Sequence, residues 1–384
     1  MPEAVIVSAL RTPVGTAVKG TLRDTTAFDL ADHVVGAVAR GLDPERVDDV
    51  ILGEGLYGGG VLARHAALTA GLTAVPGQAV NRHCAAGLTA VADAAASVRA
   101  GMDDLVIAGG VNSASTAPKS RFRVDGEWVE PWMPPTHPDR PDAPNADMSI
   151  TVGWNTAQRV GISREDMDAW ALRSHRNAVR AIDEGRFEEE IVPIETPHGL
   201  FSVDEHPRRS TSLEKLAALK PLHPEIEGFS ITAGNACGGN DGAAVLAVAS
   251  EGAAASSGLP VLAVVRSWAH VGVDPAETGL APLKAVPKAL ARAGLTIADV
   301  DLFEINEAFA AVAVAAVRRL ELDPDRVNVN GSGCSLGHPV AATGARMLVT
   351  LVHQLRRQGG GIGVAAMCAG GGMGSAMVVE VPAP

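Results

Sequence analysis

The fold is decided by a stretch whose pattern occurs twice: Ala289-Leu290-Ala291-Arg292-Ala293-Gly294-Leu295, followed shortly by Val300-Asp301-Leu302-Phe303-Glu304-Ile305-Asn306-Glu307. It predicts an amphipathic helix ended by a glycine C-cap, a turn and a buried strand. The same pattern stands earlier in the chain, where 37–42 (AVARGL) precedes 47–54 (VDDVILGE). The copies are separated by 253 residues, from Gly41 to Gly294.

Two further matches follow in the same order. The same shift carries Cys84 to Gly337, one residue before His338, and each of these sites lies between a short strand and a small-residue helix. Residues 105–110 also resemble 363–370, with a few residues of extra length. One match among Ala, Val and Gly could be chance. Three matches in the same order, separated by nearly the same number of residues, indicate an internal duplication of a β/α unit.

A different region separates the two halves. Residues 120–146 are rich in Pro, Trp, Asp and Arg and predict an irregular loop. Helices are predicted over 151–185, with a capping-box-like start at Ser163 and an end at Gly185, and a strand over 188–195. We expect this insertion to hold the substrate. The predicted units are an N-terminal core of 1–112 plus 239–260, a loop domain of 113–238 and a C-terminal core of 261–384.

Composition narrows the function classes. The 384 residues predict two or three domains, and 47% hydrophobic residues are enough for sizeable cores. The net charge is −12 with no basic arm, which argues against nucleic acid or an anionic membrane as the main partner. No apolar run approaches the ~18 residues of a membrane span. The four cysteines lack metal-ligand spacing, so we expect free thiols in a cytoplasmic protein without a metal site.

Four short segments look like parts of one active site. They supply two cysteines, a histidine and an asparagine, each bordered by small residues. Small neighbours let a substrate carbonyl approach sulfur and backbone N–H groups, which favours carbon–carbon bond chemistry through a thioester. The segments are 81–87 (NRHCAAG), 306–309 (NEAF), 337–339 (GHP) and 368–372 (CAGGG).

Cys84 is the candidate nucleophile. A strand over 77–80 leads into it and a helix over 85–100 follows, so its sulfur is predicted at a helix N-terminus, where thiolate is favoured. An ordinary thiol with a pKa of ~8.5 is only about 3% ionised at neutral pH, and lowering the pKa to ~7 would ionise half of it. The alternative is a buried, inert cysteine. The other three segments favour the nucleophile.

His338 and Asn306 are candidates for activating groups. His338 stands between Gly and Pro, ahead of a helix predicted over 341–355, and could activate Cys84 and donate to an oxyanion. It could instead cap that helix. Asn306 ends a strand predicted over 302–305 and could hold a water or a carbonyl oxygen. Its alternative is to cap a helix beginning at Glu307.

Cys368 follows an apolar strand predicted over 362–367 and precedes a glycine-rich turn. The glycines would expose backbone N–H groups, so Cys368 could be an acid/base and Gly370 an oxyanion donor. A phosphate-binding loop is the rival interpretation, but no Lys-Ser/Thr follows and the GxGxxG spacing is absent.

The whole set resembles the thiolases. Besides the four segments, the resemblance is carried by 7–15 (VSALRTPVG), 232–236 (TAGNA), 240–244 (NDGAA) and 327–331 (VNVNG). It implies a thiolase fold, an α/β architecture in which duplicated α/β units form αβαβα layers with an inserted loop domain. It also implies a homodimer or homotetramer, coenzyme A (CoA) as co-substrate, and no metal.

The resemblance further implies residue roles. Cys84 would be acylated, and His338 would deprotonate it and help bind the oxygen of the acetyl-CoA enolate. Asn306 would hold a water completing that oxyanion hole. Cys368 would protonate the leaving enolate and then deprotonate CoA. The amides of Cys84 and Gly370 would form the second oxyanion hole.

For CoA binding, the resemblance implies Met148, Arg208, Ala233 and Cys237, with Arg208 serving the nucleotide part. Cys237 stands where many thiolases have Ser, and Asn112 stands where Glu is usual. The Arg82-His83 pair before the nucleophile is also unusual. We expect such differences to bear on acyl-chain specificity.

The implied reaction is ping-pong: a 3-ketoacyl-CoA plus CoA gives a shortened acyl-CoA and acetyl-CoA, with Claisen condensation as the reverse. We expect the degradative direction, in fatty acid metabolism, because acyl transfer to CoA is downhill. A biosynthetic acetoacetyl-CoA thiolase is the nearest alternative. A 3-ketoacyl synthase-like enzyme would need a histidine in place of Cys368. The alternative of another class is a non-catalytic acyl-CoA-binding or scaffold protein.

Overall fold

The computed structural model describes residues 2–55, 61–131, 133 and 135–383. The first set of strands runs in the order β4-β3-β5-β10-β1. The strands β3, β4 and β5 are parallel, whereas β10 runs antiparallel to both of its neighbours. A short β2 (Gly15–Thr16) extends β10. The bounds are β1 (Ala4–Arg11), β3 (Asp49–Gly53), β4 (Gly77–Val80), β5 (Leu105–Ser113) and β10 (Asn240–Ser250).

The second set repeats this order and these directions. It runs β12-β13-β14-β11, with β12 and β13 parallel and β14 antiparallel to both of its neighbours. A parallel bridge from Phe303 to Val327 takes the place that β4 has in the first set. The predicted duplication is therefore confirmed by topology. The bounds are β11 (Ala263–Gly272), β12 (Leu302–Ile305), β13 (Gly361–Ala369) and β14 (Met373–Val381).

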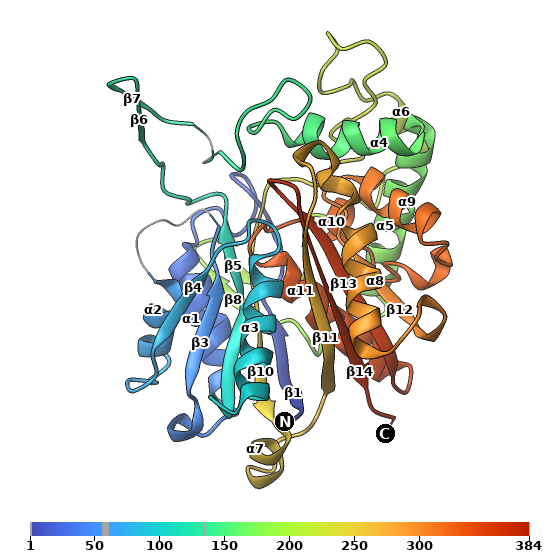
Figure 1. Ribbon diagram of the computed structural model, residues 1–384. Coiled ribbons are helices and arrows are strands. Elements are labelled where there is room, and N and C mark those ends of the chain that lie inside the picture. The colour runs from blue at the N-terminus through green and yellow to red at the C-terminus, as the bar shows by residue number, and fades with distance from the viewer. Residues whose placement is uncertain (1, 56–60, 132, 134, 384) are drawn as a thin grey trace.

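Helices and strands alternate in five layers (Figure 1). Within the described residues, the two sets of strands pair directly only at Val5–Val264 and Ile6–Ala263. Two helices contact strands of both sets and so form the middle layer, while the other pairs cover the outer faces. The middle helices are α3 (Ala86–Ala100) and α11 (Thr343–Arg357); the outer ones are α1 (Ala27–Ala39) and α2 (Leu62–Thr69) on one side, and α8 (Pro282–Ala293) and α9 (Ala310–Arg319) on the other.

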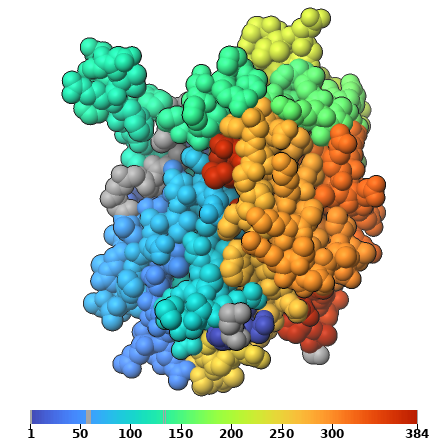
Figure 2. Space-filling model, in the orientation of Figure 1, coloured from blue at the N-terminus to red at the C-terminus, as the bar shows by residue number. Residues whose placement is uncertain are grey.

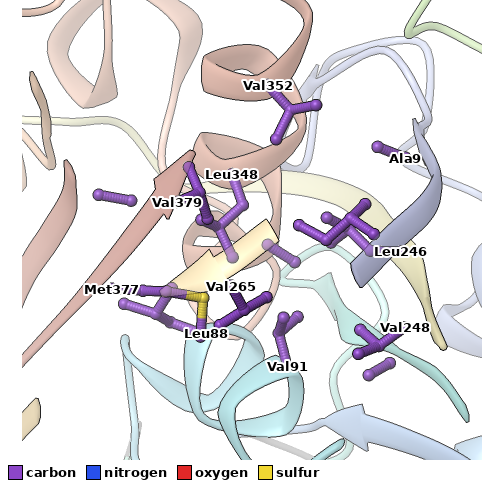
Figure 3. Close-up of a cluster of buried hydrophobic side chains, with 14 of the residues drawn as sticks. Ala9, Leu88, Val91, Leu246, Val248, Val265, Leu348, Val352, Met377 and Val379 are labelled. Carbon is purple, nitrogen blue, oxygen red and sulfur yellow. The ribbon is translucent and has the colours of Figure 1, made fainter. Parts of the chain in front are cut away.

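Both middle helices are buried along most of their length. α3 is largely apolar, which suits a helix with little solvent face, whereas α11 also buries the polar side chains of Arg346, Thr350 and His353. Figure 3 shows Leu88 and Val91 of α3 with Leu348 of α11, among side chains of both sheets such as Val265 and Leu246. Small side chains replace aromatics here, so the layers approach closely. The predicted helices over 85–100 and 341–355 match α3 and α11 with shifts of one or two residues.

The insertion lies over one end of the layers, and the two chain ends lie at the other (Figure 1). The capping box at Ser163 and Asp166 is confirmed, as is the end at Gly185, whose φ is +67°. A short hairpin interrupts the predicted irregular loop. The elements are β6 (Phe122–Val124), β7 (Glu127–Val129), η2 (Ser149–Trp154, a π-helix), α4 (Asn155–Val160), α5 (Arg164–Asp183), β8 (Ile194–Thr196), β9 (Gly199–Phe201) and α6 (Leu213–Ala217).

The predicted strand over 188–195 is wrong. The backbone N–H groups of Glu190 and Ile191 both donate to the carbonyl of Phe187, so the segment turns, and only Ile194–Thr196 forms a strand. The cause is the buried Arg11, whose Nε lies 2.6 Å from Glu190 Oε1. The remaining short helices are η1 (Pro44–Arg46), α7 (Glu251–Ser256), η3 (Pro275–Leu280), η4 (Ile297–Asp299), η5 (Pro324–Arg326) and α10 (Gly333–Leu336).

Glycines allow the middle helices to touch. A Cβ at Gly344 of α11 would lie 2.6 Å from Leu88 of α3, and a Cβ at Gly87 would lie 2.6 Å from the Ala341 carbonyl oxygen. No real Cβ fits at such distances, so any larger residue would push α3 and α11 apart.

We predict that Gly344→Ala destabilises the protein by ~1–3 kcal/mol, because the methyl group overpacks the helix contact. Gly36→Ala in α1 is the matched control, since its Cβ would have nothing within 4 Å. It should raise stability by ~0.5–1 kcal/mol through helix propensity. Thermal unfolding checks both, and equal midpoints for the two variants would contradict the close packing.

Candidate active site

The site lies where the N-terminal ends of α3 and α11 meet the carboxyl ends of β12 and β13. The insertion lies directly above it, and the red β13–β14 turn is visible beneath the insertion in Figure 2. Each half of the duplication therefore contributes one helix start to a single site.

Cys84 sits in a tight turn between β4 and α3. The Asn81 side chain accepts from the His83 N–H at 2.9 Å, and the Ala86 N–H donates to the His83 carbonyl at 3.0 Å. His83 has a φ of +46°, in the left-handed region that non-glycine residues rarely adopt. This turn leaves Cys84 partly exposed, just before the first residue of α3.

Burial raises the pKa of the Cys84 thiol above its ordinary value. The N–H groups of Gly370 and of Cys84 itself act on the sulfur in the opposite direction, without reversing the shift. The shift is therefore opposite to the lowering expected at a helix N-terminus, because desolvation outweighs the two backbone N–H groups. The resting group is a thiol that needs a base. Both expected oxyanion donors, the Cys84 and Gly370 amides, border the sulfur.

His338 is held as a neutral imidazole. Its backbone N–H donates to Asn240 Oδ1 at 2.9 Å, and its Nδ1 lies 2.7 Å from Thr343 Oγ1. Since the Thr343 hydroxyl donates to the Pro339 carbonyl, its oxygen accepts from Nδ1–H, which leaves Nε2 unprotonated. Burial lowers the pKa of His338 to about 3. Nε2 is buried and has no partner within the described chain, so it is free to take a proton.

Asn306 lies beside this imidazole, with Nδ2 3.4 Å from Nδ1 of His338. Its Oδ1 is buried and has no hydrogen-bond partner among the described residues. The capping alternative is wrong, because α9 begins at Ala310 with Phe309 as its N-cap. His338 is not the N-cap of α11 either, since Ala342 is the N-cap and makes no side-chain hydrogen bond.

Cys368 lies near the end of β13, buried among the other thiols of the site. Burial raises the pKa of its thiol far above the ordinary range, and Cys84 and Cys237 are close enough to add to the shift. In the glycine turn that follows, Gly371 has a φ of +86°. A Cβ at Gly370 would lie 3.1 Å from Thr136 of the insertion and 3.8 Å from Met148.

The four residues expected to bind CoA separate into two groups. Met148 and Cys237 adjoin the thiols, and burial with the nearby Cys84 raises the pKa of Cys237 to about 12. Ala233 is exposed in the turn that leads toward Cys237. Arg208 lies instead against His175 of α5, lining a pocket that none of the other site residues lines.

Sequence reasoning missed the residues that hold His338. Asn240 fixes its backbone and Thr343 fixes its ring, while Asn112 donates to the Asn240 carbonyl at 3.0 Å. A histidine flanked by Gly and Pro implies some external support, but nothing in the spacing indicates a residue 98 positions away.

Glu307 is the other missed residue. Its carboxylate is fully buried and accepts from four groups, which tie α5 and the segments around η5 and α10 to the end of β12. The donors are Trp170 Nε1, Ser174 Oγ, Asn328 Nδ2 and the Cys334 N–H. A Glu in an apolar run could have signalled such a role. Among the described residues, no group of three or more His, Cys, Asp or Glu is arranged to hold a metal ion.

Comparison with known families decides the identity. Residues 4–252 match the family described as "Thiolase, N-terminal domain", and residues 259–381 match "Thiolase, C-terminal domain". The chain belongs to the thiolase family. It is thus a member of a family of acyltransferases.

Named relatives of this thiolase cover nearly its whole length. The acetyl-CoA acetyltransferase of Escherichia coli strain K12 is 42% identical over 402 residues, with 99% of each chain covered. The 3-ketoacyl-CoA thiolase of Bacillus subtilis strain 168 is 39% identical over 405 residues, covering 99% of this chain and all of the relative.

Solved structures agree with the layered architecture. The Bacillus anthracis acetyl-CoA acetyltransferase superposes with a TM-score of 0.90 at 38% identity, covering 99% of both chains. Human mitochondrial 3-ketoacyl-CoA thiolase gives 0.91 at 35% identity, covering 100% of this chain and 99% of the other. The predicted thiolase fold is therefore confirmed.

The raised pKa of Cys84 predicts how the thiol reacts. Its alkylation by iodoacetamide should keep accelerating as pH rises beyond ~8.5, because the thiolate forms only above the ordinary thiol pKa. Peptide mass spectrometry across a pH series measures the rate, and Cys84→Ser identifies the labelled site. A rate already constant near neutral pH would contradict the raised pKa.

Proposed function

We propose that this thiolase cleaves a 3-ketoacyl-CoA with CoA through an acyl-enzyme on Cys84. The observations that carry the proposal are a neutral, buried His338 whose Nε2 has no partner in the described chain, and a protonated Cys84 bordered by two backbone donors. A base and an oxyanion site are what acyl transfer to a thiol requires.

In the first half-reaction, His338 Nε2 takes the Cys84 proton and the sulfur attacks the ketone carbonyl. The Cys84 and Gly370 N–H groups hold the resulting oxyanion. As it collapses, the carbon–carbon bond breaks and its electron pair leaves as the enolate of acetyl-CoA. His338 and a water held by Asn306 stabilise the enolate oxygen, and Cys368 gives its proton to the enolate carbon.

In the second half-reaction, the Cys368 thiolate takes the proton of incoming CoA. The CoA sulfur attacks the thioester, Cys84 leaves as thiolate, and His338 returns its proton. The strongly raised pKa of Cys368 suits both steps, because the thiol keeps its proton until a basic enolate appears and its thiolate is then a strong base.

We also propose that Met148, Ala233 and Cys237 contact CoA near the reacting sulfur and that Arg208 serves its nucleotide part. The position of Met148 beside Gly370, and of Cys237 beside Cys84, supports the first group. Thr136 lies over the glycine turn, which supports an acyl path under the 121–144 stretch of the insertion.

The biosynthetic acetoacetyl-CoA thiolase is kept as the second candidate. Relatives of nearly equal sequence identity carry the two names, acetyl-CoA acetyltransferase and 3-ketoacyl-CoA thiolase. The acyl-chain length of the substrate therefore has to be determined by assay. We propose the degradative direction in fatty acid metabolism on thermodynamic grounds.

The proposal includes a cytoplasmic homodimer or homotetramer built from the units 1–112 plus 239–260, 113–238 and 261–384. The strands support this division, since along the chain β10 is the last strand of the first set and β11 is the first of the later strands that form the second set. In the described chain β4 has a strand neighbour on one side only, which supports self-association. No helix in the described ranges is both long and apolar enough to cross a bilayer.

We predict that Cys368→Ala lowers thiolysis turnover ~100- to 10,000-fold, the usual contribution of a general acid–base group. Cys334→Ala is the control, because Cys334 is an equally buried thiol that only packs and donates to the Glu307 carbonyl. It should keep near-normal turnover. Full activity in Cys368→Ala, with Cys84 still open to alkylation, would rule out the assigned role.

Substrate length separates the two candidates. Purified protein should cleave acetoacetyl-CoA and longer or ring-bearing 3-ketoacyl-CoAs in the presence of CoA. Turnover of acetoacetyl-CoA alone would favour the biosynthetic enzyme. No thiolysis of any of them would contradict the proposed reaction.

A further inference from the structure

His223 of the insertion lies between two carboxylates. Its Nδ1 lies 2.8 Å from Oε1 of Glu225, and its Nε2 lies 2.8 Å from Oδ2 of Asp147. An ionised carboxylate only accepts hydrogen bonds, so both ring nitrogens have to donate, and the ring is an imidazolium in this arrangement. Within the described chain, Asp147 from the segment before η2 and Glu225 from the segment of His223 itself are the charged groups that act on the ring.

Asp147 uses its other oxygen to hold the start of η2. Oδ1 accepts from the Ser149 N–H at 3.0 Å, from the Ser149 hydroxyl at 2.7 Å and from the Ile150 N–H at 3.3 Å. Met148 stands inside this turn, and its Sδ lies 3.8 Å from the place of a Cβ on Gly370. The carboxylate that His223 holds therefore also holds the backbone that carries Met148.

The ring of His223 is anchored on its other side by aromatic packing. It meets the buried Phe229 edge-on, with 4.9 Å between the ring centroids, and Phe229 packs in turn against Trp154 of η2 at 5.1 Å. The same segment continues to Ala233. His223 thus joins two segments that we propose to contact CoA, the one of Met148 and the one of Ala233.

Ser149, His223 and Glu225 also stand in the order of a hydrolytic triad, with Ser149 Oγ 3.1 Å from Nε2 of the ring. The Ser149 hydroxyl donates to Asp147 instead, and a ring that donates from both nitrogens cannot take its proton. The cluster is therefore a clamp on the chain and not a second catalytic centre.

We propose that His223 is a positioning residue of the thiolase reaction, an inference that rests on the proposed function. By bridging Asp147 and Glu225 as a cation, it fixes the start of η2 and with it the Met148 side chain beside Gly370. A neutral ring carries one proton and can donate to only one of the two carboxylates, so deprotonation opens the clamp.

The clamp is complete at low pH and is lost as pH rises. The hydrogen bond to Glu225 is the largest cause that raises the pKa of His223 above its ordinary value; it outweighs burial, and the charge of Asp147 adds to it. The bridging cation is therefore fully present below the ordinary histidine pKa of ~6.5, and it disappears as pH rises through the raised value.

Methionine methyl NMR tests this coupling without any turnover. In protein labelled with ¹³C at the methionine methyl groups, the Met148 signal is identified by its loss in Met148→Leu. It should shift between pH ~6.5 and ~8.5 as His223 loses its proton, a window in which burial keeps His338 neutral and Cys84 protonated. His223→Gln should show no such shift.

His65→Gln is the matched control, because His65 on α2 also faces a carboxylate, that of Asp32 at 2.9 Å. In this variant the Met148 signal should shift as it does in the wild type. No shift in the wild type, or the same shift in His223→Gln, would overturn the proposal.

Steady-state thiolysis of acetoacetyl-CoA adds the functional readout. At pH ~6.5, His223→Gln should raise KM ~3- to 10-fold with kcat unchanged, the loss expected from about one charge-assisted hydrogen bond. The difference should vanish as pH rises and the wild-type clamp opens. A KM difference that is the same at every pH would also overturn the positioning role. Absence of thiolysis would contradict the proposed function alone, because the methyl signal decides the clamp without turnover.

Discussion

Contact between α3 and α11 in the middle layer is the constraint on which the rest of the structure depends. The missing side chains of Gly87 and Gly344 let the two helix starts pack in direct contact. The small side chains on the rest of their surfaces let both sheets pack closely against them. One helix follows Cys84 and the other follows His338, so the packing distance of the layer fixes the distance between nucleophile and base. The duplication supplies the two helices, and the site is the seam between its copies.

Burial where the two halves meet is the largest influence on the pKa values of the reacting groups. It keeps His338 neutral and keeps the thiols of Cys84 and Cys368 protonated, so these three groups carry no charge before substrate arrives. Charge then develops only where backbone N–H groups and Asn306 are in place to receive it. Glu307 and Asn240 contribute indirectly, because each fixes a loop that carries one of the reacting groups.

Most of the fold could be predicted from local pattern. The strands over 77–80 and 302–305 were predicted to the residue, each placed directly before a candidate active-site segment. The segment over 188–195 failed because a distant buried charge, Arg11, captures Glu190. Long-range contacts also explain why Asn240 and Thr343 were missed. The pKa of Cys84 could not be inferred from its place on a helix, since desolvation depends on the packing of both halves.

Trapping the acyl group tests most directly whether the seam forms one catalytic centre. Brief incubation with acetoacetyl-CoA without free CoA, then acid quenching and peptide mass spectrometry, should place a single acetyl group on Cys84. His338→Ala should acquire it far more slowly, while Gly36→Ala behaves as the wild type. Acetylation of Cys237 or Cys368 in preference to Cys84, or the same rate without His338, would contradict a nucleophile and base shared between the two halves.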